Sequence, residues 1–96
     1  KSDLVLALAL IHHLCISKNA RFEQVADTFH QLAPWLVVEF AEKSDPKVLQ
    51  LLSYRKDIFD GYTRDNFEEV FRRHYAIEEI YQLSGTARTL YLMQRR

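Results

Sequence analysis

The sequence has little cysteine and no surplus of either charge, and each shortage excludes a class of protein. A single cysteine, Cys15, cannot form an internal disulfide, which favours a reducing, cytoplasmic setting over a disulfide-rich secreted fold. Thirteen basic and thirteen acidic residues cancel, whereas proteins that bind nucleic acid or a membrane surface usually carry a basic surplus. We therefore expect neither nucleic acid nor a membrane as a partner.

Long apolar runs are also missing. The run over residues 4–11 ends at His12, well short of the roughly eighteen residues that a transmembrane helix needs. Because 48% of the residues are hydrophobic and 12% are aromatic, the chain can still bury a core. Its 96 residues predict one domain that spans 1–96.

The first half of the chain predicts a strand, a helix and a second strand. "DLVLALAL" lacks the alternation of a half-exposed strand, and its leucines and alanines would also suit a helix, but its context favours a strand buried on both faces. "ARFEQVADTFHQLA" has the apolar stripe of an amphipathic helix that ends before Pro34. "WLVVEFA" is rich in β-branched and aromatic residues, which is typical of a buried strand.

The second half predicts helices followed by a hairpin. Asp45 can cap a helix and Pro46 fits its first position, and Thr63 or Asp65 can cap the next helix after a turn at Gly61. "AIEEIYQL" and "RTLYLMQR" flank the turn "SGTA", so they predict two antiparallel strands. The expected fold is α/β, with a parallel crossover, a C-terminal antiparallel hairpin, about four strands and about three helices.

Four segments in this order resemble the second half of a class I (Rossmann-like) S-adenosylmethionine-dependent methyltransferase. The segments are "DLVLALALIHHL" for the family's fourth strand and the loop after it, "PWLVVEFAEKSDPKV" for the fifth strand and its helix, "FDGYTRDNFEEVFRRHY" for the segment before the sixth strand, and "IEEIYQLSGTARTLYLMQR" for the closing hairpin. The likeness covers the whole chain. It implies that the last strand inserts antiparallel between the fifth and the sixth.

The chain departs from the family in its glycines. The family binds its cofactor mainly on a glycine-rich loop after the first strand, whereas this sequence holds only Gly61 and Gly85. The resemblance therefore implies the C-terminal, substrate-side half of a methyltransferase-like domain, without the N-terminal cofactor-binding half. The first residue, Lys1, is not methionine, which also suggests a fragment. We expect the full-length parent to transfer a methyl group from S-adenosylmethionine to an unknown acceptor, and the fragment alone to bind no cofactor and to be inactive.

Two histidines follow the first predicted strand, at the edge where open α/β sheets bind ligands. The resemblance places the backbone around Ala9, Leu10 and His12 near the methionine part of the cofactor. It also turns one ring, of His12 or His13, toward the acceptor as a polar contact or a general base. The other interpretation is that both rings are half exposed and cap the end of the strand and the short helix that follows it. We predict no metal site, because adjacent residues of an extended chain point to opposite faces.

Glu39 ends the second predicted strand and is a third candidate catalytic residue, which would orient the acceptor. It can equally pair with Lys43 or cap a neighbouring loop. Arg88 is predicted to form an ion pair with Glu78 or Glu79 across the hairpin. Phe40, Tyr81, Tyr91 and Trp35 are predicted to lie in the core. The loop residues Tyr54, Arg55, Tyr62 and Arg64 can cover a substrate. Alternatively, the tyrosines pack the loop and the arginines stay solvated.

The first strand also suggests an interaction with a second copy. In the family this strand lies beside the first strand of the missing half, so here its edge offers unpaired backbone groups. We expect a homo-oligomer formed through Leu4 to Leu10. Two other classes stay open, namely a non-enzymatic α/β protein-interaction domain and an α/β module that binds an unrelated cofactor.

Overall fold

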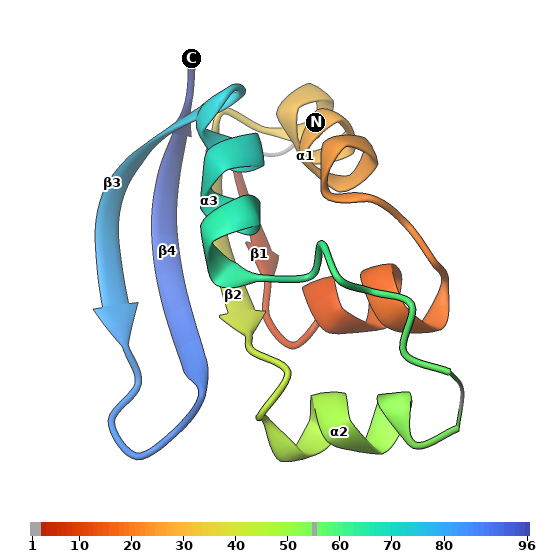
Figure 1. Ribbon diagram of the computed structural model, residues 1–96. Helices are drawn as coiled ribbons and strands as arrows, with labels where there is room; N and C mark the ends of the chain where they lie inside the picture. Colours follow the sequence, from red (N-terminus) through yellow and green to blue (C-terminus); the bar gives the residue numbers. More distant parts are fainter. Residues whose placement is uncertain (1–2, 55) are drawn as a thin grey trace.

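The strands and helices follow one another in the predicted order. The computed structural model describes residues 3–54 and 56–96. Figure 1 shows their arrangement. The elements are β1 (Leu4–Ala7), the π-helical segment η1 (His13–Ser17), α1 (Phe22–Leu32), β2 (Trp35–Ala41), α2 (Pro46–Leu52), α3 (Arg64–Arg72), β3 (Tyr75–Gln82) and β4 (Arg88–Arg95).

The strands form a four-stranded sheet with the order β1-β2-β4-β3. β1 and β2 are parallel, with Leu4 beside Trp35, and the chain between them crosses through η1 and α1. β4 is antiparallel to β2 and also to β3. The predicted α/β fold is therefore confirmed, and the last strand inserts between its two neighbours as the resemblance implied.

Two predicted helix caps hold the polar connections in place. The Asp45 carboxylate accepts the N–H of Lys47 at 2.9 Å, and Pro46 takes the first position of α2. Thr63, and not Asp65, caps α3 by accepting the N–H of Asn66 at 3.2 Å. Such caps typically stabilise a helix by about 1 kcal/mol, so both helix starts follow from local sequence.

An aromatic core lies between the sheet and the helices. Phe67 of α3 stacks on Phe40 of β2 with ring centroids 4.8 Å apart, and it contacts Phe22 of α1 edge-on at 5.6 Å. Tyr91 of β4 lies 5.2 Å from the same ring. Figure 1 shows α3 in front of the sheet. Phe40 and Tyr91 are fully buried, as predicted.

The opposite face of the sheet is only partly covered. Val37 of β2 and Leu92 of β4, which face each other across the two strands, are half-buried, while their neighbours Val38 and Tyr91 are fully buried. Tyr81 lies beside Leu90 on this side and is 55% exposed. Its predicted place in the core is therefore wrong, because Tyr81 belongs to an edge strand and points away from the helices.

The first strand is shorter than predicted. β1 ends at Ala7 instead of continuing to Leu10, because Ala9 adopts a left-handed backbone conformation with φ 56°. A helical segment takes over within a few residues, and His12 already has helical angles of φ −66° and ψ −33°. The two histidines thus lie on a helical segment, and the premise of an extended chain was wrong.

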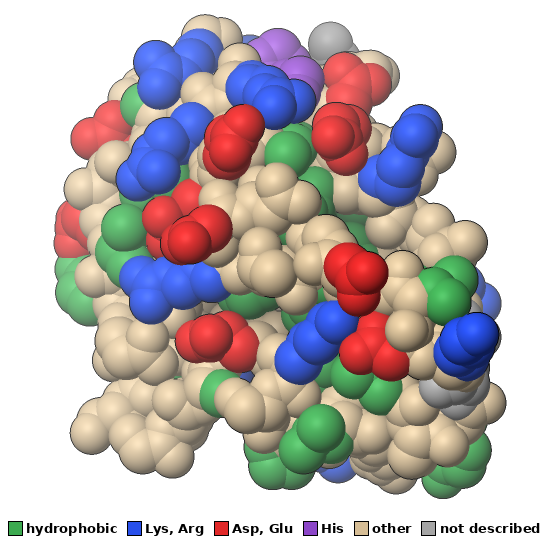
Figure 2. All heavy atoms as spheres, viewed as in Figure 1, with side chains coloured by type: hydrophobic (Ala, Val, Ile, Leu, Met, Phe, Trp, Pro, Cys, Tyr) green, Lys and Arg blue, Asp and Glu red, His purple; other side chains and the backbone are tan. Residues whose placement is uncertain are grey.

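Charges of both signs intermingle on the side of the molecule that carries the helices (Figure 2). Exposed arginines pair with acids one helical turn away, for example Arg73 with Glu69 at 3.3 Å. In the described part of the chain, none of the helices has the length and apolar character needed to cross a membrane.

Candidate functional site

The predicted site residues gather at one edge of the sheet. β1 and β2 are parallel, so their carboxyl ends meet at the same edge, and the amino end of β4 lies beside them because Arg88 pairs with Ala41. This is the edge at which open α/β sheets bind ligands. The chain after β1 supplies Ala9, Leu10 and the two histidines, and β2 supplies Glu39.

A tight turn follows β1, and two of its residues, Ala9 and Leu10, are exposed. Ala9 is exposed and donates its N–H to Glu39 Oε1 at 2.9 Å. Leu10 is 36% exposed, and its carbonyl accepts the N–H of Leu14 at 3.0 Å. The carboxylate of Glu39 therefore holds the turn in the left-handed conformation that an alanine rarely adopts.

Arg88 joins two carboxylates at this edge. Its Nη1 donates to Glu39 Oε1 at 2.9 Å, while Nε and Nη2 donate to the two oxygens of Asp45 at 2.8 and 3.1 Å. The side chains of Arg88, Glu39 and Asp45 are 20%, 11% and 5% exposed. The predicted pairing of Arg88 with Glu78 or Glu79 is therefore wrong.

Lys43, the other predicted partner of Glu39, pairs instead with Asp57 at 3.1 Å. The Arg88 side chain, by hydrogen bonding, holds the pKa of Asp45 below its ordinary value, and the N–H of Lys47 lowers it further. Hydrogen bonding to Asp45 raises the pKa of Arg88 in turn. Both groups of this pair stay charged, and together with Glu39 they link β2, β4 and α2.

The two histidines differ in exposure. His12 is 1% exposed, and its Nδ1 has no hydrogen-bond partner among residues 3–54 and 56–96. Burial, together with the charges of His13 and Arg88, lowers the pKa of His12, so its ring is neutral at pH 7. His13 is exposed, and its ring lies 4.9 Å from that of His12. His13 is therefore the imidazole that a ligand can reach.

A cleft of about 500 Å³ lies beside the charged network. The residues of its walls are Ser44, Asp45 and Pro46 on one side and Gly85, Thr86, Ala87 and Arg88 on the other. Figure 2 shows it as a notch at the lower edge, between the β3–β4 turn and α2. Asp45 and Arg88, which are paired with each other, both line this cleft.

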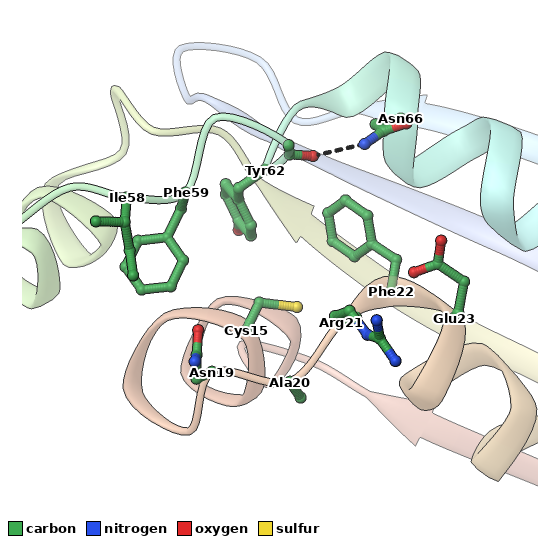
Figure 3. A pocket seen from close by; sticks show the side chains of 11 residues that line it. Cys15, Asn19, Ala20, Arg21, Phe22, Glu23, Ile58, Phe59, Tyr62 and Asn66 are labelled. Carbon is green, nitrogen blue, oxygen red and sulfur yellow. Dashed lines mark hydrogen bonds between the residues drawn. The ribbon is translucent and has the colours of Figure 1, made fainter.

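A second pocket, of about 290 Å³, lies where η1, the start of α1 and the loop before α3 meet (Figure 3). Phe22, Phe59 and Tyr62 form apolar walls. The Tyr62 hydroxyl donates to the carbonyl of Ala41 at 2.5 Å, so this loop tyrosine is part of the packing. Cys15 also lines the pocket, and burial raises the pKa of its thiol to about 12, which keeps it protonated.

Tyr54 and Arg64, which were predicted to act together with Tyr62, do not line this pocket. Tyr54 is 80% exposed, and Arg64 donates to Glu68 at 3.0 Å and to the Tyr91 hydroxyl at 3.1 Å. Arg55 lies outside the described residues. No group of three or more histidine, cysteine, aspartate or glutamate side chains in the described part of the chain is arranged to hold a metal ion.

Sequence reasoning missed Asp45 and Arg88 as members of the site. Asp45 was interpreted only as a helix cap, and Arg88 was assigned to the hairpin. The register of β4 against β2 is the feature that brings these residues together. It pairs Arg88 with Ala41, so that Arg88 lies on the same face as Glu39 and diagonally across from it. That register is a long-range property, since 49 residues separate Glu39 from Arg88.

The fold and the site define an α/β domain with a polar cluster at the carboxyl edge of its parallel strands. No protein-family model matches the chain, and no solved structure matches it. It is similar to nodulation protein NoeA of Rhizobium meliloti (strain 1021), with 35% identity over 94 residues, which is 98% of this chain. The chain spans about a fifth of that protein, since the match covers 20% of it.

Proposed function

We propose that this chain is the substrate-side part of a methyltransferase-like Rossmann domain, and that the full-length protein transfers a methyl group from S-adenosylmethionine to an acceptor. The order β1-β2-β4-β3, with β4 antiparallel between its neighbours, is the observation that carries the proposal. It is the arrangement that the resemblance implied for the carboxyl-terminal half of that family. The similarity to a fifth of NoeA supports a place within a longer protein.

By resemblance, the chain around Ala9, Leu10 and His12 would hold the methionine part of the cofactor. Ala9 and Leu10 are exposed and can be reached by a ligand, whereas His12 is buried. S-adenosylmethionine, when bound, supplies a methyl group on a positively charged sulfur. The glycine-rich loop that grips the rest of it would lie in another segment, so we expect these 96 residues alone to be inactive.

The chain's own residues would align the acceptor and accept its proton. His13 is exposed and carries the only histidine ring beside the turn that reaches solvent among the described residues, so it is the better candidate for a general base. Glu39 would act on the acceptor indirectly, because its carboxylate binds the N–H of Ala9 and the guanidinium of Arg88. Holding the two reactants in place would supply much of the rate.

The free, buried Cys15 supports a reducing, cytoplasmic setting.

Isothermal titration of the full-length protein with S-adenosylmethionine tests the proposal. We expect measurable binding and competition by S-adenosylhomocysteine. Leu10→Arg, which changes an exposed side chain on the turn, should weaken binding by at least about tenfold because it blocks the edge. Leu32→Arg, at an exposed position at the end of α1, is the matched control and should bind normally. The absence of both heat and competition would refute the proposal.

A further inference from the structure

The pocket of about 290 Å³ beside η1 shares no lining residue with the polar cluster at the carboxyl edge. Its walls come from η1 and the start of α1 on one side and from the loop before α3 on the other (Figure 3). One of its lining residues, Phe22, contacts Phe40 of β2 edge-on at 6.2 Å, and β2 has a neighbouring strand on each side. The pocket is therefore built from this chain alone, over an interior strand of the sheet.

The loop that forms one wall is held in place by several contacts. The Asp57 carboxylate accepts the N–H of Phe59 at 3.0 Å and pairs with Lys43 at 3.1 Å. The N–H of Tyr62 donates to the carbonyl of Phe59 at 3.0 Å, and the Tyr62 hydroxyl is bound to the carbonyl of Ala41. A ligand that enters a preformed pocket has to order few protein groups, which favours binding.

The inner surface of the pocket is apolar and aromatic. Cys15, Phe22 and Tyr62 are buried, and Phe59 is half-buried beside them. Because the Tyr62 hydroxyl already donates to the backbone, the pocket meets the ring of Tyr62. The Cys15 thiol stays protonated, and sulfur makes favourable contacts with aromatic rings. This surface suits an aromatic group better than a charged one.

The mouth and the size of the pocket narrow the class of ligand. Arg21 and Glu23 are the charged members of the lining, and both are exposed. Their opposite signs cancel, so the mouth selects neither an anion nor a cation. A cavity of about 150 Å³ holds benzene, and ligand pockets begin at about 300 Å³. The volume of about 290 Å³ therefore suits one or two fused rings.

We propose that this pocket binds a small, uncharged aromatic molecule of one or two fused rings, between the rings of Phe22 and Phe59 and beside the Cys15 sulfur. The proposal does not depend on methyl transfer, because the pocket and the carboxyl edge have no lining residue in common.

Isothermal titration of the full-length protein with 2-naphthol, an uncharged molecule of two fused rings, tests the proposal. We expect saturable binding with a Kd of about 1 mM or tighter, unchanged in the presence of S-adenosylhomocysteine. Decahydro-2-naphthol, which has the same skeleton without aromatic rings, should bind about threefold more weakly or worse. Equal binding of the two molecules would overturn the aromatic class, and competition with S-adenosylhomocysteine would overturn the separate site.

Two variants locate the ligand. Phe59→Ala removes one wall and should weaken binding of 2-naphthol by about tenfold. Ile58→Asp places a charge at a lining position that is 65% exposed, so it should weaken binding by about fivefold while the fold is retained. Leu49→Asp, at a position that is 53% exposed on α2 and outside the lining, is the matched control and should bind normally. Circular dichroism shows that each variant is folded. The absence of saturable binding, or binding that neither variant weakens, would overturn the proposal.

Discussion

Replacing Arg88 by methionine tests the charged network at the edge of the sheet. The change leaves the carboxylates of Glu39 and Asp45, with side chains 11% and 5% exposed, without their cation. Removing one partner of a buried ion pair costs about 3–5 kcal/mol, and because Arg88 itself is 20% exposed we expect about 3 kcal/mol. A small domain has about 5–15 kcal/mol in total, so this loss of the free energy of unfolding is large.

Urea unfolding followed by circular dichroism measures the effect at pH 7. Arg73→Met is the matched control, because Arg73 and Glu69 form an ion pair whose side chains are 57% and 70% exposed. Exposed pairs contribute only about 0.2–1 kcal/mol. If Arg88→Met costs no more than Arg73→Met, then the network contributes little and our account of the edge is wrong.

The same variant should change the dependence of stability on pH. Asp45 has a folded-state pKa below its ordinary value of 3.8, so its contribution is present above that value and is lost as the pH falls through the lowered pKa. Arg88 is the main cause of the lowering. Arg88→Met should therefore lose less stability between pH 5 and pH 2 than the parent chain does. An unchanged acid dependence would mean that Arg88 does not lower the pKa.

Three further changes test other parts of the structure. Ala9→Gly should stabilise the fold by about 0.5–1 kcal/mol in urea unfolding, because glycine tolerates the positive φ of 56°; a loss of stability would contradict the left-handed turn. Cys15 should react with a thiol reagent at pH 8 at least about a hundredfold more slowly in the folded chain than in urea, because its buried thiol has a raised pKa of about 12; equal rates would show that it is accessible. Thr63→Ala should lower the unfolding free energy by about 1 kcal/mol, since it removes the cap of α3, and an unchanged midpoint would argue against that cap.

The parts of the fold that were predicted correctly depend on local chemistry. The apolar stripe of α1, the β-branched run of β2 and the caps at Asp45 and Thr63 are encoded within a few residues, and each is present. The order of these elements then leaves few ways to arrange the sheet, because parallel strands joined through a helix cross over right-handed. The resemblance supplied the remaining step, which is the position of β4.

The site was harder to predict because its contacts are long-range. The end of β1 has no local signal in a run of leucine and alanine, and it is set by the hydrogen bond from Ala9 to Glu39, 30 residues away. Arg88 likewise chooses Asp45, 43 residues away, over the acids across its own hairpin. A charged side chain pairs with the opposite charge that the register of neighbouring strands brings near it. That register cannot be predicted from the composition of a single strand.

A crystal structure of the full-length protein with S-adenosylhomocysteine is the most direct test of the central claim. We predict that the methionine part of the ligand contacts the backbone at Ala9 and Leu10, beside the carboxyl end of β1, with a glycine-rich loop from another segment on its far side. A ligand bound elsewhere, or a carboxyl edge of β1 and β2 that is buried under another part of the protein, would contradict the account.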